Sequence, residues 1–327
     1  MPQKMRKGSM EFWPHRRAKA QMPRVRTWPK SAEPGFLGSV AFKAGMTHIM
    51  MVDDSASPAK GTEISRAVTV LEMPKVYIYG IRFYDTKYLY TQPSSEAYDA
   101  ALAKKVGINK TNTELSKIKE DMSKYVDVSA LAFLDASSLG FGNKRVMRFE
   151  LGIGGKDVND KLAFVEKFFG KEIKINDVLG VGDYVDTTSI SKGKGWAGVI
   201  KRFGVARNVR KATGKIRHLG VLGPWHPAKV MFTVPHSGHM GYNYRTDLNK
   251  RVLKIGTDKD AAAVNAKGGF INYGLVKNDF IILDGSIPGP AKRLVRIRKS
   301  IRNKSQKKEP QINYISTATQ HPYPCLS

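Results

Sequence analysis

The sequence lacks two features that would restrict its fold: repeated cysteines and long apolar runs. Its 327 residues include one cysteine, Cys325, so a disulfide within the chain and CxxC metal or redox motifs are excluded. Gly, Lys or Asp breaks every apolar run, whereas a membrane-spanning helix needs about 20 consecutive apolar residues. The basic N-terminus leads into no apolar segment typical of a secretory signal. We therefore exclude an integral membrane protein and expect a reducing, intracellular compartment.

Acidic residues are also scarce. The chain has 28 Asp and Glu against 55 Lys and Arg, which gives a formal net charge of +27 and makes a polyanion the leading partner class. This charge is concentrated: residues 1–30 and 288–327 each carry +8, residues 190–260 carry +12, and the rest carry −1. The sequence predicts a neutral body with three basic segments.

The longest stretch without acid lies between Asp186 and Asp247. Its 60 residues contain eleven Lys and Arg, four His and nine Gly. Like charges without counter-charges repel, and too few apolar residues are present to form a core, so we expect an extended segment that orders only against a polyanion. Basic residues interleaved with aromatic ones suit phosphate neutralisation and base stacking. The large apolar side chains are Trp196, Phe203, Trp225, Phe232, Tyr242 and Tyr244.

The neutral part of the chain is typical of a mainly β fold. Short segments rich in Val, Ile and aromatic residues, separated by turn-forming residues, predict strands at 36–42, 47–52, 67–73, 76–84, 146–151, 183–190, 251–255, 280–283 and 293–297. Many short strands favour a β-barrel over a parallel sheet. Helical patterns at 97–106, 114–124 and 160–169 predict an α-containing insertion in this barrel.

The predicted organisation follows the charge. We expect a basic N-terminal extension over residues 1–30 and a β-barrel body over 31–189 and 250–290, with the α-containing insertion at about 93–175. A long extended internal arm occupies 190–249, and the last barrel strand and a basic C-terminal tail occupy 291–327.

Three features of the arm could form a functional site: a glycine-rich loop, a histidine pair and a tryptophan between two prolines. Gly193, Gly195 and Gly198 allow close backbone approach, but they lack the GxxxxGK[ST] spacing of a nucleotide site. The HxxH pair His236 and His239 could form a metal site or a nuclease-type acid–base pair. No Cys, Asp or Glu in the run completes such a site, so hydrogen bonding to RNA is favoured.

Trp225 lies between Pro224 and Pro227, which stiffen the backbone around it. We expect this tryptophan to stack on a partner. Packing against the protein body is the alternative.

Several of these segments together resemble one family. The residues that carry the resemblance are Leu179, Asp186, Ser189, Ser191, Gly193, Lys194, Gly195, Gly198 and Arg202, with the segments AFKAGMT, GPWHPAKV and GSIPGPAKRLVRIR. They are similar to ribosomal protein L3 of the large subunit over nearly the whole chain. The WHPA and YNYRTDLNK sequences and the compact C-terminus resemble its archaeal branch. Thr213 and Gly214 depart from eukaryotic relatives, so a histidine modification of that branch is not expected here.

The resemblance implies a translation-protein-type β-barrel in the cytoplasm, seated in the ribosome. It implies basic extensions that enter large-subunit rRNA early in assembly, and an arm that reaches toward the peptidyl transferase centre with Trp225 at its tip and His226 beside it. Ribosomal proteins L14 and L24e are the implied neighbours. We expect a structural protein and no enzyme, with no cofactor of its own, no small-molecule substrate and no membrane partner. Structural Mg²⁺ or K⁺ would be bound by the rRNA.

The predicted rRNA-binding residues lie in the arm and at both termini. They are Lys192, Lys194, Trp196, Lys201, Arg202, Arg207, Arg210, Lys211, Lys215, Arg217, His218, Trp225, His226, Lys229, His236, His239, Arg245, Arg16, Arg17, Arg24, Arg26, Lys292 and Arg293. Two alternatives remain: an RNA-processing factor or nuclease that uses the arm histidines, and peripheral binding to anionic lipid.

Overall fold

The computed structural model describes residues 16–85, 90–91, 106–107, 119, 122–143, 146–212, 214–302 and 309–320. The chain divides into two units, each described by itself. We call Met22–Ser189 with Thr246–Ser327 the body, and Met1–Gln21 with Ile190–Arg245 the arm unit. No helix among the described residues is long and apolar enough to cross a membrane.

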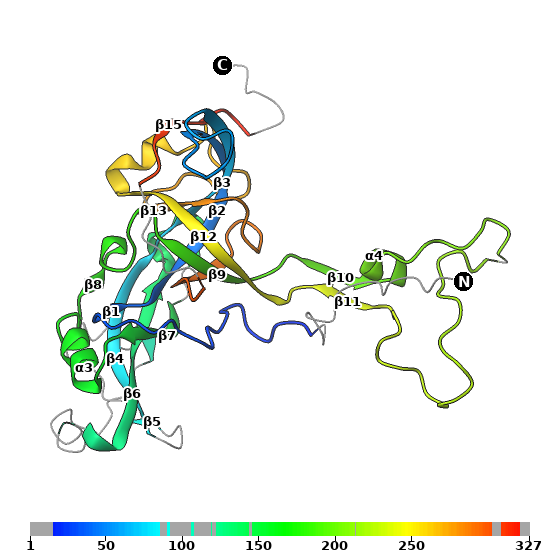
Figure 1. Cartoon of the computed structure of the whole chain (residues 1–327), viewed down its shortest axis with the longest axis horizontal. Helices are drawn as coiled ribbons and strands as arrows, with labels where there is room; N and C mark the ends of the chain where they lie inside the picture. Colours follow the sequence, from blue (N-terminus) through cyan, green and yellow to red (C-terminus); the bar gives the residue numbers. More distant parts are fainter. Residues whose placement is uncertain are drawn as a thin grey trace. The chain divides into compact units, whose positions relative to one another are not determined.

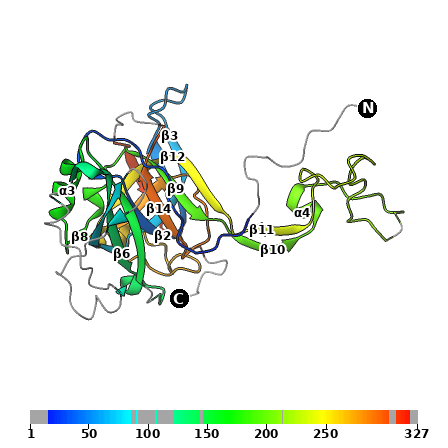
Figure 2. The same cartoon turned by 90° about the horizontal axis from the view of Figure 1, so that it is seen from below.

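The body contains a β-barrel of six strands. Their order is β14 (Leu294–Lys299), β9 (Tyr184–Ile190), β12 (Tyr244–Gly256), β13 (Phe280–Asp284), β3 (Glu63–Glu72) and β2 (Gly38–Val52). β14 pairs with β2 as well as with β9, so the sheet closes on itself, and Figure 2 shows β14 between these two strands. β15 (Ile312–Ile315) adds to the far end of β2. The predicted mainly β, barrel-type fold is confirmed.

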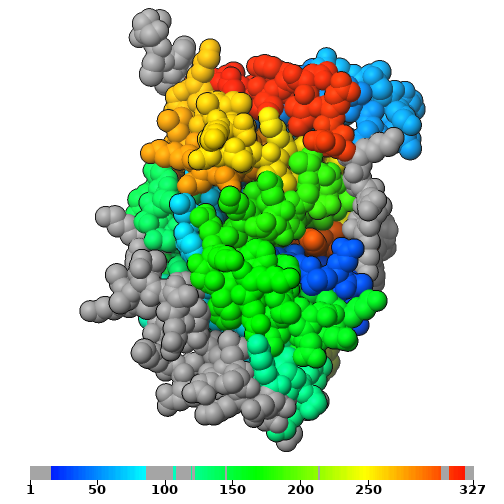
Figure 3. All heavy atoms as spheres, turned by 90° about the vertical axis from the view of Figure 1, so that its left-hand side faces the viewer, coloured from blue at the N-terminus to red at the C-terminus, as the bar shows by residue number. Residues whose placement is uncertain are grey.

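A second sheet completes the body (Figure 1). Its order is β1 (Gly35–Phe36), β7 (Val146–Gly154), β6 (Tyr125–Asp135), β4 (Lys75–Asp85) and β5 (Tyr90–Thr91), with β8 (Glu172–Ile173) also on β4. Helix α3 (Val158–Glu166) contributes Phe164, whose ring meets that of Phe36 edge-on at 4.9 Å. The surface of residues 155–182, drawn in green, covers the middle of the face in Figure 3. Short 3-10 helices are η2 (Met122–Lys124), η3 (Ala136–Ser138), η4 (Ile175–Asp177) and η5 (Asp258–Ala263).

One apolar core runs through both sheets. Phe42, Phe83, Leu134 and Phe280 are at most 1% exposed, and they come from β2, β4, β6 and β13. Burial of side chains this large is the main favourable term in folding. The body is therefore a folded platform that needs no partner to form its core.

Two buried carboxylates of the body have hydrogen-bond partners within it. The fully buried Asp186 carboxylate accepts hydrogen bonds from Arg298 Nη2 at 3.1 Å, Arg298 Nε at 3.2 Å and the Asn249 backbone N–H at 3.0 Å. Glu72 accepts from Asn278 Nδ2 at 2.7 Å and from the Tyr273 hydroxyl. Buried carboxylates persist in proteins when they are paired in this way.

The predicted strands are all present, and two differences in the body stand out. The predicted gap between residues 42 and 47 is wrong because β2 continues through it with a bulge between Lys43 and Gly45. A Cβ at Gly45 would lie 2.5 Å from the Phe270 ring, so only glycine allows the bulged strand to lie this close to Phe270. β6 was not predicted, because Ala130 and Ala132 are weak strand formers; burial between β4 and β7 overrides this.

The helix predictions have mixed outcomes. The pattern at 160–169 corresponds to α3, which begins two residues earlier and ends three earlier than predicted. The patterns at 97–106 and 114–124 fall mostly outside the described residues, and residues 122–124 of the latter form η2. The predicted insertion also contains β6, β7 and β8.

Candidate nucleic-acid interface

The arm unit has an ordered base. β10 (Gly193–Ala197) and β11 (Gly238–Gly241) form an antiparallel pair that we call the ribbon, and helix α4 (Val199–Phe203) follows β10. Ala197, Val199 and Phe203 are 4%, 8% and 7% exposed, and we call these three buried apolar side chains the small cluster at the ribbon. The prediction of a wholly extended arm is wrong at this point, because composition does not reveal the strand pairing and the helix that bury these residues.

Glycine is required at the centre of the ribbon. Gly241 has a φ of +75°, and a Cβ there would lie 2.0 Å from the Lys192 carbonyl oxygen. Gly195 has a φ of +65°, but a Cβ there would meet no atom within 4 Å. The first glycine permits close pairing of the two strands, and the second leaves open backbone that a ligand can approach.

The segment from Arg16 to Ala20 contacts residues 242–244, directly after β11. The Ala18 N–H donates to the Tyr242 carbonyl at 2.8 Å, Asn243 Nδ2 donates to the Arg16 carbonyl at 3.0 Å, and Ala18 is 7% exposed. These contacts bring the basic residues Arg17 and Lys19 to the ribbon, although they precede it by more than 170 residues.

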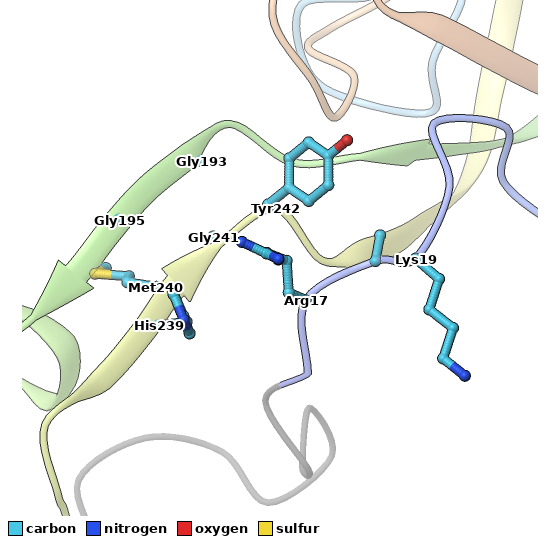
Figure 4. A pocket seen from close by; sticks show the side chains of 9 residues that line it. Arg17, Lys19, Gly193, Gly195, His239, Met240, Gly241 and Tyr242 are labelled. Atoms are coloured by element: carbon cyan, nitrogen blue, oxygen red, sulfur yellow. The ribbon is translucent and has the colours of Figure 1, made fainter.

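Two hollows lie along the ribbon, and His239, Met240 and Gly241 line both of them. One, of about 460 Å³, is lined by Arg17, Ala18, Lys19, Gly193, Gly195, His239, Met240, Gly241 and Tyr242 (Figure 4). The other, of about 440 Å³, is lined by Ser191, Lys192, Lys194, Arg202, His239, Met240, Gly241, Asn243 and Arg245. Residues 193 and 195 line one face while 192 and 194 line the other, as the alternation of side chains along a strand requires.

Beyond the ribbon the arm has no regular structure. Residues 205–212 and 214–237 contain neither helix nor strand, and the basic residues among them, Arg207, Arg210, Lys211, Lys215, Arg217 and Lys229, are exposed, as is Lys201 on α4. Large apolar side chains face solvent there: Trp225 is 88% exposed and Phe232 65%, and on the ribbon Trp196 is 69% exposed. Packing of Trp225 against protein, the alternative from the sequence, is absent from this structure.

Two arginines of the arm unit, Arg202 and Arg245, are partly buried. Arg202 Nη1 donates to the His236 carbonyl at 2.9 Å, and its guanidinium lies 5.2 Å from the Phe203 ring centre. Burial lowers the pKa of Arg202 and of Arg245. No Asp or Glu occurs from residue 187 to 246. The run therefore supplies no carboxylate for its own cations, which suits the binding of an external anion.

The four arm histidines either contact an aromatic ring or accept a hydrogen bond at their backbone carbonyl. His239 meets Trp196 edge-on at 5.4 Å between ring centres, and His226 meets Trp225 at 6.3 Å. The His218 carbonyl accepts from Asn208 Nδ2 at 3.3 Å. Among the residues that the structure describes, no group of three or more His, Cys, Asp or Glu could hold a metal ion.

The predicted binding residues are divided between the two units. The ribbon brings together Lys192, Lys194, Trp196, Arg202 and Arg245, with Arg17 beside them. Arg24, Arg26, Lys292 and Arg293 belong to the body instead. There Arg24, Arg26 and Lys292 are exposed, while Arg293 is half-buried.

The predicted binding residues leave out several that line the hollows, among them Lys19, Tyr242 and Asn243. Lys19 shares its basic segment with Arg16 and Arg17, so its charge was a usable signal. Tyr242 and Asn243 are brought to the site by the pairing of β10 with β11, which no local pattern reveals.

Comparison with known proteins places the chain in the class of ribosomal proteins. Residues 1–107 and 90–322 match the family described as Ribosomal protein L3. The chain therefore belongs to the ribosomal protein L3 family, as the resemblance predicted.

The chain is similar to archaeal members of this family over almost its full length. It is 40% identical to the large ribosomal subunit protein uL3 of Methanothermobacter thermautotrophicus over 337 residues, covering 96% of this chain and 97% of that protein. It is also 40% identical to the protein of the same name from Methanobrevibacter smithii, covering 95% and 96%. The prediction of an archaeal-type chain is confirmed.

Proposed function

We propose that the chain is a structural protein of the large ribosomal subunit that binds large-subunit rRNA through its arm. Family membership supports the first part, since relatives of nearly equal length are proteins of this subunit. One observation carries the second part: the arm unit holds partly buried cations and exposed aromatic rings in a stretch without carboxylates. The site of action is the ribosome in the cytoplasm.

The arm suits packed RNA better than an open duplex. A-form RNA offers backbone phosphates, 2′-hydroxyls and unstacked bases, while its major groove is too narrow for side chains to read. A loop without helix or strand can follow narrow channels between RNA helices, its Lys and Arg contacting phosphates and its rings stacking on bases. Most contacts would then go to phosphate and sugar.

The finer assignments extend this proposal. The arm reaches toward the peptidyl transferase centre with Trp225 at its tip, and the chain joins the subunit early in assembly beside L14 and L24e. Peptide-bond chemistry belongs to the RNA, and Mg²⁺ or K⁺ near the arm is bound by rRNA. The 88% exposure of Trp225 and the stiff Pro224–Pro227 segment around it support a tip that stacks on nucleotides.

Sedimentation of a gently prepared lysate on a sucrose gradient tests the function. Mass spectrometry follows this chain with and without a high-salt wash. We expect stoichiometric recovery with the large subunit that survives the wash. Recovery in light fractions, or release by moderate salt, would indicate a peripheral RNA-binding or processing factor. The nuclease alternative would then have to be tested.

The Trp225→Ala variant tests the tip assignment. We expect ribosomes that assemble but show altered aminoacyl-tRNA binding or altered sensitivity to drugs at the catalytic centre. Val221, also in the arm loop and 87% exposed, provides a matched control in Val221→Ala. Normal behaviour of Trp225→Ala in both assays would contradict the assignment.

A further inference from the structure

Residues 268–276 of the body, which we call the aliphatic loop, present two exposed aliphatic side chains. Ile271 is 42% exposed and Leu275 is 51% exposed. We propose that this loop is a docking surface for a neighbouring protein of the large subunit, one that offers an apolar pocket with carboxylates at its rim. The inference rests on the proposed function, because it takes the partner from the same particle.

A buried carboxylate holds the C-terminal end of the aliphatic loop in place. Glu72 of β3 is fully buried, and it accepts hydrogen bonds from the Tyr273 hydroxyl and, at 3.0 Å, from the Lys277 N–H. Asn278 donates to the same carboxylate twice, from its backbone N–H at 3.0 Å and from Nδ2 at 2.7 Å. A carboxylate is costly to bury without such donors, so the loop is fixed firmly to the barrel.

The tip of the loop is closed by its own backbone. The Phe270 N–H donates to the Gly274 carbonyl at 2.9 Å, and the Gly274 N–H donates to the Phe270 carbonyl at 3.0 Å. Between them Asn272 has a φ of +62°, a left-handed conformation that asparagine adopts more readily than most residues. Ile271 and Leu275 are therefore presented on a fixed frame, which lowers the entropy lost when a partner binds.

The exposed side chains of this loop suit a protein better than RNA. No charged residue occurs from 268 to 276, so the loop itself supplies no cation to a phosphate. Its two rings, Phe270 and Tyr273, are 2% and 4% exposed, so neither is available to stack on a base. Aliphatic groups gain free energy when apolar surface covers them, and a protein pocket provides such surface.

The charges beside the loop indicate the rim of that pocket. Lys267 and Lys277 are exposed and lie at the two ends of the aliphatic loop. Complementary charges around an interface orient the partners and speed their association. A partner with an apolar pocket and carboxylates around it therefore matches both features of the loop.

Photocrosslinking in isolated large subunits tests the class of partner. The full chain carries p-benzoylphenylalanine in place of Leu275 or, as the control, in place of Val126, a body residue that is 62% exposed. We expect position 275 to crosslink to one protein at one site, and position 126 not to give this product. A crosslink from position 275 to rRNA alone, a crosslink to a second copy of the chain, or no crosslink would overturn the proposal.

Calorimetry with the crosslinked protein, once purified, measures the contact. Ile271→Gln with Leu275→Gln should weaken its binding to the full chain about tenfold, because two side chains lose their apolar burial. Val126→Gln should stay within about twofold of wild type, and both variants should keep the wild-type affinity for large-subunit rRNA within about twofold. Unchanged binding in the double variant, no binding by wild type, or a loss of rRNA affinity in the double variant alone would overturn the docking surface.

Denaturant unfolding checks that the variants keep their fold. Both positions are exposed, so the unfolding midpoint should match that of wild type. If the double variant does not fold, the single variant Leu275→Gln replaces it.

The sedimentation experiment separates the two proposals. A chain that sediments with the large subunit but crosslinks only to rRNA from position 275 refutes the docking surface alone. A chain that remains in light fractions refutes the proposed function, and with it the choice of partner.

Discussion

Both the body and the arm unit contain Arg and Lys side chains, but the surroundings of these side chains differ. In the body, Arg298 is paired with the buried Asp186, and Arg251 Nη1 donates to Asp54 at 2.7 Å. In the arm unit, Lys192, Lys194 and Arg202 lie in a run of 60 residues that has no carboxylate. Charges satisfied within a fold stabilise that fold, whereas charges left uncompensated provide free energy for binding an external anion.

Aromatic side chains show the same contrast. Phe36 of the body is fully buried and contacts Phe164 and Phe168 at 4.9 and 5.0 Å between ring centres. Trp225 of the arm is 88% exposed. Rings that pack on each other contribute to folding, and a ring left in solvent on a stiff loop is available for a nucleobase. The body therefore provides stability, and the arm provides contact surface.

The largest effect on stability is expected for Asp186→Ala. The change leaves the Arg298 guanidinium, 11% exposed, without its carboxylate, and breaking a buried pair costs about 3–5 kcal/mol. Denaturant unfolding of the purified chain, followed by tryptophan fluorescence, measures this loss. A loss below about 1 kcal/mol would show that the body does not depend on internal charge pairing.

The arm should respond in the opposite way to loss of charge. The triple variant Arg207→Gln, Arg210→Gln and Lys211→Gln removes three exposed cations, so the free energy of unfolding should change by less than about 0.5 kcal/mol. Affinity for large-subunit rRNA should fall, and the slope of log affinity against log salt should decrease by about 2 units. Filter binding across a salt series measures this slope.

A matched triple variant on the body provides the control for that experiment. Lys60, Lys75 and Lys171 are exposed there, and their replacement by Gln should change the salt slope less than the arm variant does. Equal slopes would show that the chain attracts RNA through its net charge alone.

The half-buried pair of Asp54 and Arg251 should have a smaller effect than the pair of Asp186 and Arg298, because Asp54 is 37% exposed whereas Asp186 is fully buried. A hydrogen bond from Arg251 lowers the pKa of Asp54 below its usual 3.8. The pair therefore stabilises the fold at pH values above 3.8, and its contribution is lost as pH falls through the lowered value. Asp54→Asn should cost up to about 1 kcal/mol at pH 7, and this cost should shrink as pH falls below 3.8. A pH series of unfolding experiments measures this, and a cost that does not shrink would contradict it.

The smallest effect on stability is expected for Trp225→Ala. Because the side chain is 88% exposed, its removal should change the unfolding free energy by less than about 0.5 kcal/mol. Phe203→Ala in the small cluster at the ribbon is the contrasting variant, since Phe203 is 7% exposed. Hydrogen exchange of the ribbon amides should rise in Phe203→Ala and remain at the wild-type rate in Trp225→Ala.

Much of the body was predictable because its strands carry a local signal. Segments such as β9 and β13 are short, rich in Val and Ile, and bounded by Gly or Asp. β6 was missed because its alanines give no strand signal, and the bulge in β2 was missed because it depends on Phe270, more than 200 residues away. The sequence predicted the charges of the candidate site, but not that Lys194 and Arg245 line one hollow.

The sequence alone determined how residue types are distributed along the chain. One part is neutral and forms strands, and one long run contains cations, glycines and aromatic rings but no Asp or Glu. That pattern is local, so it can be read without coordinates. The tertiary structure decided which cations meet a carboxylate and which line the hollows of the ribbon. Compensation depends on distance in space, and the contacts that bring Asp186 to Arg298, or Arg202 to Arg245, join residues far apart in the chain.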